Sequence, residues 1–478
     1  MEPAERVDQH RGLAAGLVLT ITLVAFENLG VATAMPLVVR DLGDLHLYGW
    51  TFTAPLLASV VGITVAGPVV DRRGPGPPFA AGLVLFAGGL ALAAAAPNMV
   101  ALVAGRFIQG LGAGVVPPAA YGAIGRTFQD RARARMFALM STAWVLPGVA
   151  GPVLSGLVAE EVHWRWVFAG ILPLVPLTAM LALPALVRLG PPPAAGATAG
   201  TAGDRRRTAR AVALAAGAGM VVGGLGWLSP LAAPVVIAGG ILAVVQLRRL
   251  LPPGTLRAAP GLPAAVAARG LQTFAFFGAQ AYITLALVEV RGQRAALAGL
   301  ALTAATLFWT AGAWLQDRLG HRRGRRVLVA RGYLLVALGG VLTSSVLIDG
   351  VPVPVAVAGW GVAGLGMGLS YGGISLIVLA EAPPGGEGSA ASAMQLSDVL
   401  GMALGAGLGG AAVAVSDALD RGLRPGVAVA FALGVVGALA ACGVARRLPP
   451  TVAEQDAPPP ARSASSSTTG ELGIEAHR

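Results

Sequence analysis

Fourteen apolar runs, separated by short polar segments, occupy most of this 478-residue chain. A run of about 20 apolar residues is long enough to cross the hydrocarbon core of a bilayer as a helix. The runs lie at 13–39, 48–70, 79–96, 98–124, 136–159, 164–188, 211–228, 231–247, 264–290, 295–316, 327–348, 354–381, 390–415 and 426–445. The sequence therefore predicts an all-α membrane protein with 14 transmembrane helices.

The charged residues of the chain exclude several classes of function. They make up only 12% of the sequence, about half of the share of roughly 25% that soluble domains carry. All 34 basic residues are arginine, so the chain has no P-loop lysine for ATP hydrolysis and no Schiff-base lysine for retinal or pyridoxal phosphate. The five histidines are scattered, and the single Cys442 lies in an apolar run. We expect no enzymatic site, no metal and no cofactor.

The arginines lie mainly on one side of the predicted membrane. With the N-terminus inside, 25 fall on cytoplasmic segments, six on external segments and three within helices. The densest clusters, all on the inner side, are Arg131/Arg133/Arg135, Arg205/Arg206/Arg207 and Arg322/Arg323/Arg325/Arg326. Since positive charge gathers on cytoplasmic loops, we predict a plasma (inner) membrane protein with both termini cytoplasmic. The net charge of +11 then reflects membrane topology and not nucleic-acid binding.

The seventh and eighth runs are the weakest of the predicted helices, because they share one Gly/Ala/Val-rich stretch that is broken at 226–230. Two short helices joined by a turn fit a bilayer of about 30 Å better than one long helix. Since they come as a pair, 12 or 14 spans would leave the termini on the same side.

The predicted organisation is two six-helix bundles with an inserted helical hairpin. Residues 189–210 are rich in proline, glycine and alanine and then basic, and the last 31 residues carry prolines and a Ser/Thr cluster, as linkers and disordered tails do. The segments are 1–11 (cytoplasmic N-terminus), 12–188 (N-terminal bundle), 189–210 (cytoplasmic linker), 211–248 (inserted transmembrane hairpin), 249–447 (C-terminal bundle) and 448–478 (disordered cytoplasmic tail).

A short D-R-x-G sequence occurs twice, each time at the end of one apolar run and just before the next. The copies are Gly67-x3-Asp71-Arg72-x-Gly74 and Asp317-Arg318-x-Gly320. An aspartate beside a helix N-terminus accepts backbone N–H bonds, and its arginine can reach a carboxylate or a lipid phosphate. A single copy is as well explained by a tight turn. Two copies at matching places indicate an internal repeat, as in secondary transporters whose substrate site lies between two halves.

The fourth run contains Arg106, followed by Gln109, Gly110 and Gly112. A charged side chain in a membrane helix is costly and usually faces a partner carboxylate or a water-filled cavity. Gln109 and Gly110 share the face of Arg106, and glycine there leaves room for a neighbouring helix. A functional charge is one interpretation; a structural salt bridge or snorkelling to the cytoplasmic surface is the other.

Glu27 lies some 14 residues into the first run, too deep for a short side chain to reach the membrane surface. A carboxyl group in a low-dielectric environment can bind and release a proton in the physiological range. We therefore predict that Glu27 takes part in proton coupling and that the neighbouring Asn28 lines a cavity.

The fifth run contains Gly148, Gly151, Pro152 and Gly156. A Gly-Pro pair bends a spanning helix, and the glycines permit tight packing against a partner helix. After this run, Trp164-Arg165-Trp166 is predicted at the outer interface, where tryptophans anchor helices.

Several polar residues in the second half are predicted to line a cavity. They are Gln272, Gln280, Tyr282, Tyr371 and Asp398. Gln272 and Gln280 are eight residues apart and can share one helix face. For Asp398, eight residues into its run, a cap near the membrane surface is slightly favoured over a proton site.

These motifs together resemble the major facilitator superfamily. The segment from Gly67 to Gly74 is similar to the family's cytoplasmic loop motif, although Pro75-Gly76 stands where basic residues are usual, and the second copy has Ala313 at the family's glycine. The resemblance implies that Asp71 and Asp317 help to latch the cytoplasmic side in the outward-facing state. The string from Arg106 to Ala113 is similar to the R-x-x-Q-G-x-G-A motif, which implies a role of Arg106 in proton coupling.

Other segments resemble the fourteen-helix drug:proton antiporter branch of that superfamily. Glu27 stands nine residues before Pro36, where the first-helix motif of that branch has an aspartate. The segment around Gly151-Pro152 looks like the antiporter motif that marks exporters, with Pro147 and Ser155 in place of glycines. The W-R-W-x-F string at 164–168 is also typical of the branch.

The sequence and the resemblance together predict a secondary active transporter for proton-coupled export of small amphipathic or lipophilic compounds. Its partners would be the substrate, protons and the lipid bilayer, with no nucleic acid, and it would act as a monomer. Import, or export of a specific metabolite or lipid, is the alternative within transport. A membrane sensor or a channel is the alternative from another class.

Overall fold

The computed structural model describes residues 3–128, 136, 139–140, 142–191, 201–227, 229, 232–383 and 386–449. Within these ranges the chain is helical and has no strand. Fourteen helices are long and apolar enough to cross a membrane, which confirms the predicted all-α class and the number of spans. The Arg131/Arg133/Arg135 cluster, residues 192–200 of the linker and residues 450–478 of the tail lie outside the described residues.

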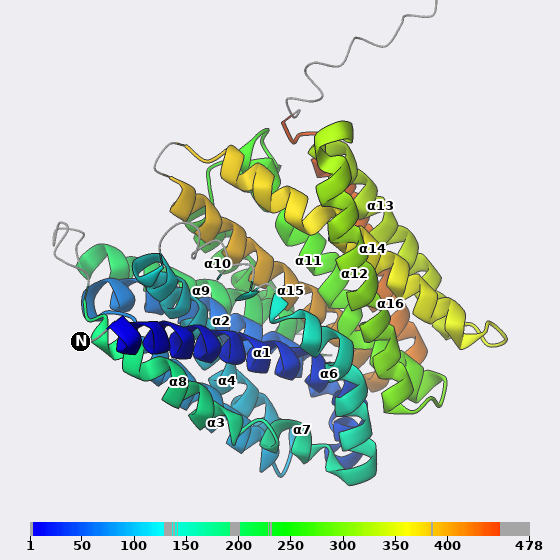
Figure 1. Cartoon of the computed structure of the whole chain (residues 1–478). Helices are drawn as coiled ribbons and strands as arrows, with labels where there is room; N and C mark the ends of the chain where they lie inside the picture. The colour runs from blue at the N-terminus through cyan, green and yellow to red at the C-terminus, as the bar shows by residue number, and fades with distance from the viewer. Residues whose placement is uncertain are drawn as a thin grey trace, which may run out of the picture.

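The N-terminal bundle contains the spans of the first 188 residues (Figure 1). Its α-helices are α1 (Pro3–Leu42), α2 (Trp50–Arg73), α3 (Gly76–Ala94), α4 (Met99–Thr127), α6 (Val145–Val158), α7 (Arg165–Ala169) and α8 (Leu174–Arg188). A π-helical segment, Ala159–His163, continues α6, and α7 and α8 together make one span.

The remaining spans form the inserted hairpin and the C-terminal bundle. The helices are α9 (Thr201–Leu225), α10 (Ala232–Leu250), α11 (Leu262–Leu285), α12 (Ala295–Arg323), α13 (Arg325–Ser344), α14 (Val353–Ala380), α15 (Glu387–Ala418) and α16 (Leu423–Ala445). A π-helical segment, Ala286–Val290, continues α11. Helix α9 begins at Thr201, so the second part of the predicted linker 189–210 is helical.

Each bundle is built from two groups of helices. In the N-terminal bundle, α1 packs along α6 and α8, while α2 and α3 pack along α4. In the C-terminal bundle, α11 packs along α15 and α16, while α12 and α13 pack along α14. Contacts between α1 and α4, and between α11 and α14, cross the boundary between the groups.

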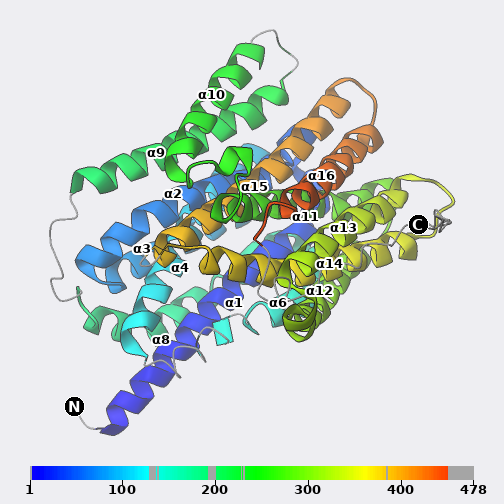
Figure 2. The same ribbon diagram turned by 90° about the horizontal axis from the view of Figure 1, so that it is seen from above.

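The inserted hairpin lies beside the seam between the bundles. Helix α9 contacts both α2 and α15, which also contact each other across the seam. Helix α10 packs on α9 and lies outermost (Figure 2), with only 6% of its most apolar stretch buried inside the protein. An apolar helix that the protein leaves uncovered is one that faces lipid.

The two bundles meet at one end of the molecule. We call this the closed end; it carries the segments 40–50, 159–165 and 289–295. The opposite end, where α1 begins and α16 ends, is called the terminal end. In Figure 1 the N-terminal helices run across the view and α12–α14 run down it, and the two sets meet near α6.

Polar contacts join the bundles in the half of the molecule near the closed end. Thr284 Oγ1 donates to Ala32 O at 2.7 Å, and Tyr48 Oη donates to Ala281 O at 2.9 Å. Arg40 Nε pairs with Glu289 Oε1 at 2.7 Å. Meanwhile Asp71 and Asp317, at the terminal end, are both exposed. The conformation is therefore one in which the bundles are joined at the closed end and diverge toward the terminal end.

Candidate functional site

Glu27 and Arg106 form a buried ion pair between α1 and α4. Each residue is 2% exposed, and Arg106 Nη1 contacts Glu27 Oε1 directly. The guanidinium has two further acceptors: Arg106 Nη1 donates to Gln109 Oε1 at 2.6 Å, and Arg106 Nε donates to Thr51 O of α2 at 3.1 Å. A carboxylate and a cation buried together in this way bridge the two helix groups of the N-terminal bundle.

The glycines after Arg106 explain how α4 comes close enough to make this pair. A Cβ at Gly110 would overlap the carbonyl oxygen of Pro55 on α2, and one at Gly112 would overlap the backbone of Gly82 and Phe86 on α3. Small residues allow membrane helices to approach at backbone distance. In the described part of the chain, Gln109 Nε2 is buried without a hydrogen-bond partner. Snorkelling of Arg106 to the surface, one of the sequence-based alternatives, is wrong.

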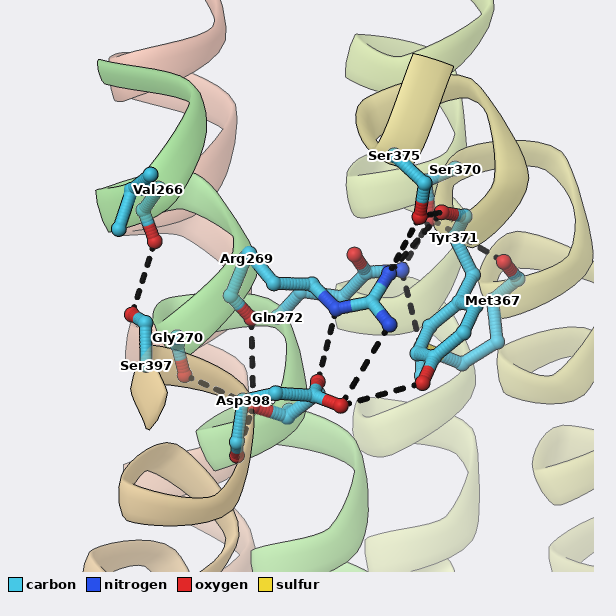
Figure 3. Close-up of polar contacts among 11 residues, drawn as sticks. Val266, Arg269, Gly270, Gln272, Met367, Ser370, Tyr371, Ser375, Ser397 and Asp398 are labelled. Carbon is cyan, nitrogen blue, oxygen red and sulfur yellow. Dashed lines mark hydrogen bonds and ion pairs between the residues drawn. The ribbon is translucent and has the colours of Figure 1, made fainter. Parts of the chain in front are cut away.

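A second buried ion pair lies in the C-terminal bundle (Figure 3). Arg269 of α11 is 3% exposed and Asp398 of α15 is 4% exposed. Arg269 Nε donates to Asp398 Oδ1 at 2.7 Å, and Arg269 Nη2 lies 3.5 Å from Asp398 Oδ2. Thr273 Oγ1 donates to the main-chain oxygen of Asp398 at 2.9 Å, which fixes α15 against α11.

Helix α14 completes this second site. Tyr371 Oη donates to Asp398 Oδ2 at 3.2 Å, and the Arg269 guanidinium lies over the Tyr371 ring. Arg269 Nη1 also donates to Tyr371 O at 2.9 Å and to Ser375 Oγ at 3.3 Å. The site therefore contains a cation, a carboxylate and a phenol from three different helices.

No role was predicted for Arg269 from the sequence. Its signal was its place among the three arginines counted within helices, in the run 264–290. Asp398 was predicted to line a cavity, with a surface cap or a proton site as alternatives, and its carboxylate is buried against Arg269, which does not fit a surface cap.

Two other predicted cavity residues are buried as well. Gln272 is 1% exposed and donates to Ser370 Oγ at 2.7 Å. Tyr282 is fully buried, and its hydroxyl donates to Ala406 O. These two predictions are corrected: close packing of α11 against α14 and α15 covers both side chains. Gln280 and Tyr371 are half-buried, and Asn28 is exposed.

The two D-R-x-G segments are helical at their charged residues, which corrects the prediction that they form loops. Asp71 and Arg72 belong to the last turn of α2, which ends at Gly74 with φ of 80°. A Cβ at Gly74 would also overlap Gly190 O. In the second copy, helix α12 continues through Gly320 and ends at Gly324, where φ is 77°. Both aspartates lie near helix C-termini, so neither caps a helix N-terminus.

The glycines of α6 pack against the other bundle. A Cβ at Gly148 would overlap Thr306 of α12, and one at Gly156 would lie 2.6 Å from Ala296 Cα. On the α12 side, a Cβ at Gly299 would lie 2.7 Å from Pro152 O. Gly151 instead faces Phe26 of α1 at ordinary contact distance. The predicted close packing of this segment against a partner helix thus occurs across the seam, where α6 meets α12.

The tryptophans after α6 differ from each other. Trp164 is 3% exposed, and its Nε1 donates to Asp41 Oδ2 at 2.8 Å. Arg165 Nη1 pairs with the same oxygen at 3.0 Å. Trp166 is 57% exposed. The predicted interface position fits Trp166, whereas Trp164 is a buried packing residue.

The arrangement described so far, two helical bundles that each bury one ion pair and meet at one end, is that of a multi-pass membrane transporter. Residues 17–406 match the family model described as Major Facilitator Superfamily. The chain belongs to this superfamily, and the resemblance stated from its motifs is confirmed.

Curated relatives match either nearly the whole chain or about a third of it. A probable multidrug-efflux transporter of Mycobacterium tuberculosis is 28% identical over 465 residues, which cover 93% of this chain and 97% of that protein. A multidrug transporter protein of Bacillus subtilis is 35% identical over 156 residues, 33% of this chain and 29% of that protein.

Solved structures share the fold. A bacterial homologue of the human lysosomal transporter Spinster, in an inward-facing and unoccupied conformation, has a TM-score of 0.63 at 14% identity and covers 94% of this chain and 98% of that one. A peptide transporter POT in complex with sulfate has a TM-score of 0.62 at 15% identity and covers 90% of this chain and 95% of that one.

Proposed function

We propose that this protein is a proton-coupled exporter of small amphipathic or lipophilic compounds, acting as a monomer in the plasma membrane with both termini cytoplasmic. The observation that carries the proposal is the buried Glu27–Arg106 pair between α1 and α4. Charged groups inside membrane proteins are expensive and typically belong to ion or proton pathways. The multidrug-efflux relative that covers most of the chain supports the direction and the substrate class.

Protonation of Glu27 is the proposed coupling step. A proton on the Glu27 carboxyl removes its negative charge and with it most of the attraction to Arg106. Arg106 then keeps two acceptors, Thr51 O and Gln109 Oε1, so its charge is not left without partners. Because α1 and α4 belong to different helix groups, the proton changes the free-energy difference between two arrangements of the bundle.

The conformation in which the bundles are joined at the closed end fits one step of the proposed transport cycle. On the basis of the arginine distribution we assign the terminal end to the cytoplasm, and in this assignment the bundles diverge toward the cytoplasm. In an antiporter this is the state that has released its proton and accepts substrate. An ionised Glu27 paired with Arg106 is the form that this state requires.

Opening toward the outside would need the contacts at the closed end to separate. The Glu160 carboxylate accepts a hydrogen bond from Ala295 N at the beginning of α12, and both Glu160 and Glu161 pair with Arg294. The close approach of Gly156 to Ala296 lies next to these pairs. In that state Asp71 and Asp317 would latch the terminal end.

An aromatic cluster beside the second ion pair supports a lipophilic substrate. The rings of Phe276 and Trp360 stack at 4.6 Å between centroids, and Trp309 lies 5.6 Å from Phe276 and 5.1 Å from Tyr371. Trp309 is half-buried. Aromatic faces bind apolar groups and organic cations.

The test is transport by purified protein in proteoliposomes that carry an imposed pH gradient. Cationic dyes, antibiotics and lipids are screened as substrates of the wild type. We expect Glu27→Gln to abolish gradient-driven transport at normal expression, because the amide cannot take up the proton. Asp349→Asn, which alters an exposed carboxylate paired with Arg424, is the matched control and should transport normally. Gradient-driven transport by Glu27→Gln at the wild-type rate would refute the proposal.

A further inference from the structure

The network of Arg269, Asp398 and Tyr371 has no part in the coupling proposed for Glu27. It connects the two helix groups of the C-terminal bundle. Helices α11 and α15 approach each other so closely that a Cβ at Gly401 would overlap Gly270 O. Helix α14 packs with α12 and α13 in the other group. The network is thus a charged connection across this boundary, which the hydrogen bond from Gln272 to Ser370 also crosses.

The charge of Arg269 does not depend on Asp398 alone. Arg269 Nη1 donates to Tyr371 O and Ser375 Oγ, and the guanidinium lies over the Tyr371 ring. A backbone carbonyl, a hydroxyl and an aromatic face all stabilise a cation without carrying a negative charge. When Asp398 is neutral, Arg269 therefore keeps three partners, and the cost of an unpaired buried cation is avoided.

Tyr371 can serve both charge states of Asp398. Its hydroxyl donates to Asp398 Oδ2 at 3.2 Å when the carboxylate is ionised. A phenol also accepts hydrogen bonds, so a protonated Asp398 can donate to the same oxygen. The hydrogen bond survives in either direction, which keeps both forms of the carboxyl group satisfied.

Other titratable groups lie close to this network. Tyr333 of α13 lies near Arg269, Tyr121 of α4 in the other bundle lies near Tyr371, and Cys442 of α16 lies near Tyr333. On α2 and α9, the residues that pack near Val399 are the apolar Val60 and Ala211. Asp398 is the carboxylate of this group, and Arg269 is its strong cation.

Tyr371 is the most accessible member of the network. Tyr371 is half-buried, and Gly372 beside it is exposed. Tyr121, which is 47% exposed, belongs to α4 of the other bundle and lies near Tyr371. Arg269 lies about two helical turns from the terminal end of α11, which is the end at which the bundles diverge.

We propose that in each transport cycle Asp398 binds a second proton from the compartment at the closed end, when the bundles open there, and releases it past Tyr371 to the compartment at the terminal end. The proton adds to a carboxylate oxygen, and the Asp398–Arg269 ion pair becomes a hydrogen bond between a neutral carboxyl and a guanidinium. No covalent bond of the protein changes. Loss of the charge weakens the attraction of α15 for Arg269 of α11, while the contacts of Arg269 with α14 and the Tyr371–Asp398 hydrogen bond remain. This proposal rests on the proton coupling proposed for Glu27.

Infrared difference spectroscopy of the purified full-length protein during a pH titration tests this without any substrate. Protonated carboxyl groups in apolar surroundings give separate C=O stretching bands. We expect two such titrating bands in the wild type, of which Asp398→Asn removes one and Glu27→Gln removes the other. A wild-type-like spectrum of Asp398→Asn would overturn the inference. Loss of only the Asp398 band, with no band for Glu27, would instead contradict the first proposal and leave this one standing.

Transport gives the second readout. Asp398→Asn leaves Arg269 buried without its carboxylate and can fail to fold for that reason. The double variant Arg269→Gln/Asp398→Asn removes both charges of this pair and is therefore used for the transport measurement. In proteoliposomes, the proton-to-dye ratio is measured for a cationic dye from the substrate screen, as the membrane voltage that stops net flux. We expect the double variant to export with a ratio lower by one proton. An unchanged ratio would mean that the pair only holds the helices together.

Discussion

The two bundles each bury one acid–arginine pair on their first helix, but with opposite charge placement. In the N-terminal bundle the acid is on the first helix, as Glu27 of α1, and Arg106 is on α4. In the C-terminal bundle the first helix, α11, carries the arginine, Arg269. The depths are also opposite: Arg106 lies about two helical turns from the closed end of α4, and Arg269 about two turns from the terminal end of α11.

The pairs also differ in how well their carboxylates are satisfied. Among the described contacts, Glu27 accepts a hydrogen bond from Arg106, whereas Asp398 accepts from both Arg269 and Tyr371. The carboxylate of the first pair therefore depends on one cation, whereas the carboxylate of the second pair also has a neutral donor, the Tyr371 hydroxyl. The N-terminal pair is therefore the more sensitive to a change in the charge of its carboxyl group, and for this reason we assign it the principal coupling role.

The largest expected effect comes from removing the arginine of each pair. Arg106→Gln leaves the buried Glu27 without its cation, and breaking a buried pair in this way costs about 3–5 kcal/mol. Arg269→Gln leaves the Tyr371 hydroxyl on Asp398, so its loss should be smaller by about 1.5–3 kcal/mol, the worth of a hydrogen bond to a charged group. The midpoint of thermal unfolding in detergent should therefore fall further for Arg106→Gln.

The double variant Glu27→Gln/Arg106→Gln is the control for this comparison. It contains no unpaired charge, so it should recover most of the stability that Arg106→Gln loses while remaining unable to couple transport to protons. Equal losses for Arg106→Gln and Arg269→Gln would show that the Tyr371 hydroxyl contributes nothing, and the contrast between the bundles would then be wrong.

A smaller effect is expected from the glycine that lets α4 approach α2. Gly110→Ala places a methyl group against Pro55 O, and overpacking of this kind costs about 1–3 kcal/mol. Gly67→Ala is the matched control, because a Cβ there meets no atom within 4 Å. Thermal unfolding should separate the two variants, with Gly67→Ala close to the wild type. If Gly110→Ala is equally stable, the close packing that sets the Glu27–Arg106 distance is not as described.

The number of spans and the first ion pair could be predicted from the sequence because their signals are local. A run of about 20 apolar residues specifies a spanning helix by its length alone. Glu27 lies so deep in its run that no surface position was available to it, and the string around Arg106 carried the glycines that its packing needs. A partner carboxylate was one of the two environments expected for Arg106, and Glu27 provides it.

The second ion pair could not be predicted, because its members lie 129 residues apart and no sequence motif links Arg269 to Asp398. The ends of α2 and α12 were missed for a different reason. Both D-R-x-G copies contain a glycine at the same spacing, but only Gly74 adopts a positive φ and ends its helix. In the second copy Gly324 does so, one turn after Gly320. Which glycine ends a helix depends on the packing around it, and the four-residue motif does not contain that information.

The smallest expected effect on stability is found among the neutral side chains that contact the two ion pairs. Tyr371→Phe keeps the ring under Arg269 but removes the hydroxyl that donates to Asp398, which should cost about 1.5–3 kcal/mol. Gln109→Leu removes an acceptor from Arg106 but also removes a buried amide nitrogen that has no partner in the described part of the chain. The two contributions oppose each other, so the midpoint of unfolding should change little. A larger drop for Gln109→Leu than for Tyr371→Phe would reverse the contrast, since it would make the amide at the N-terminal pair the more important neutral partner.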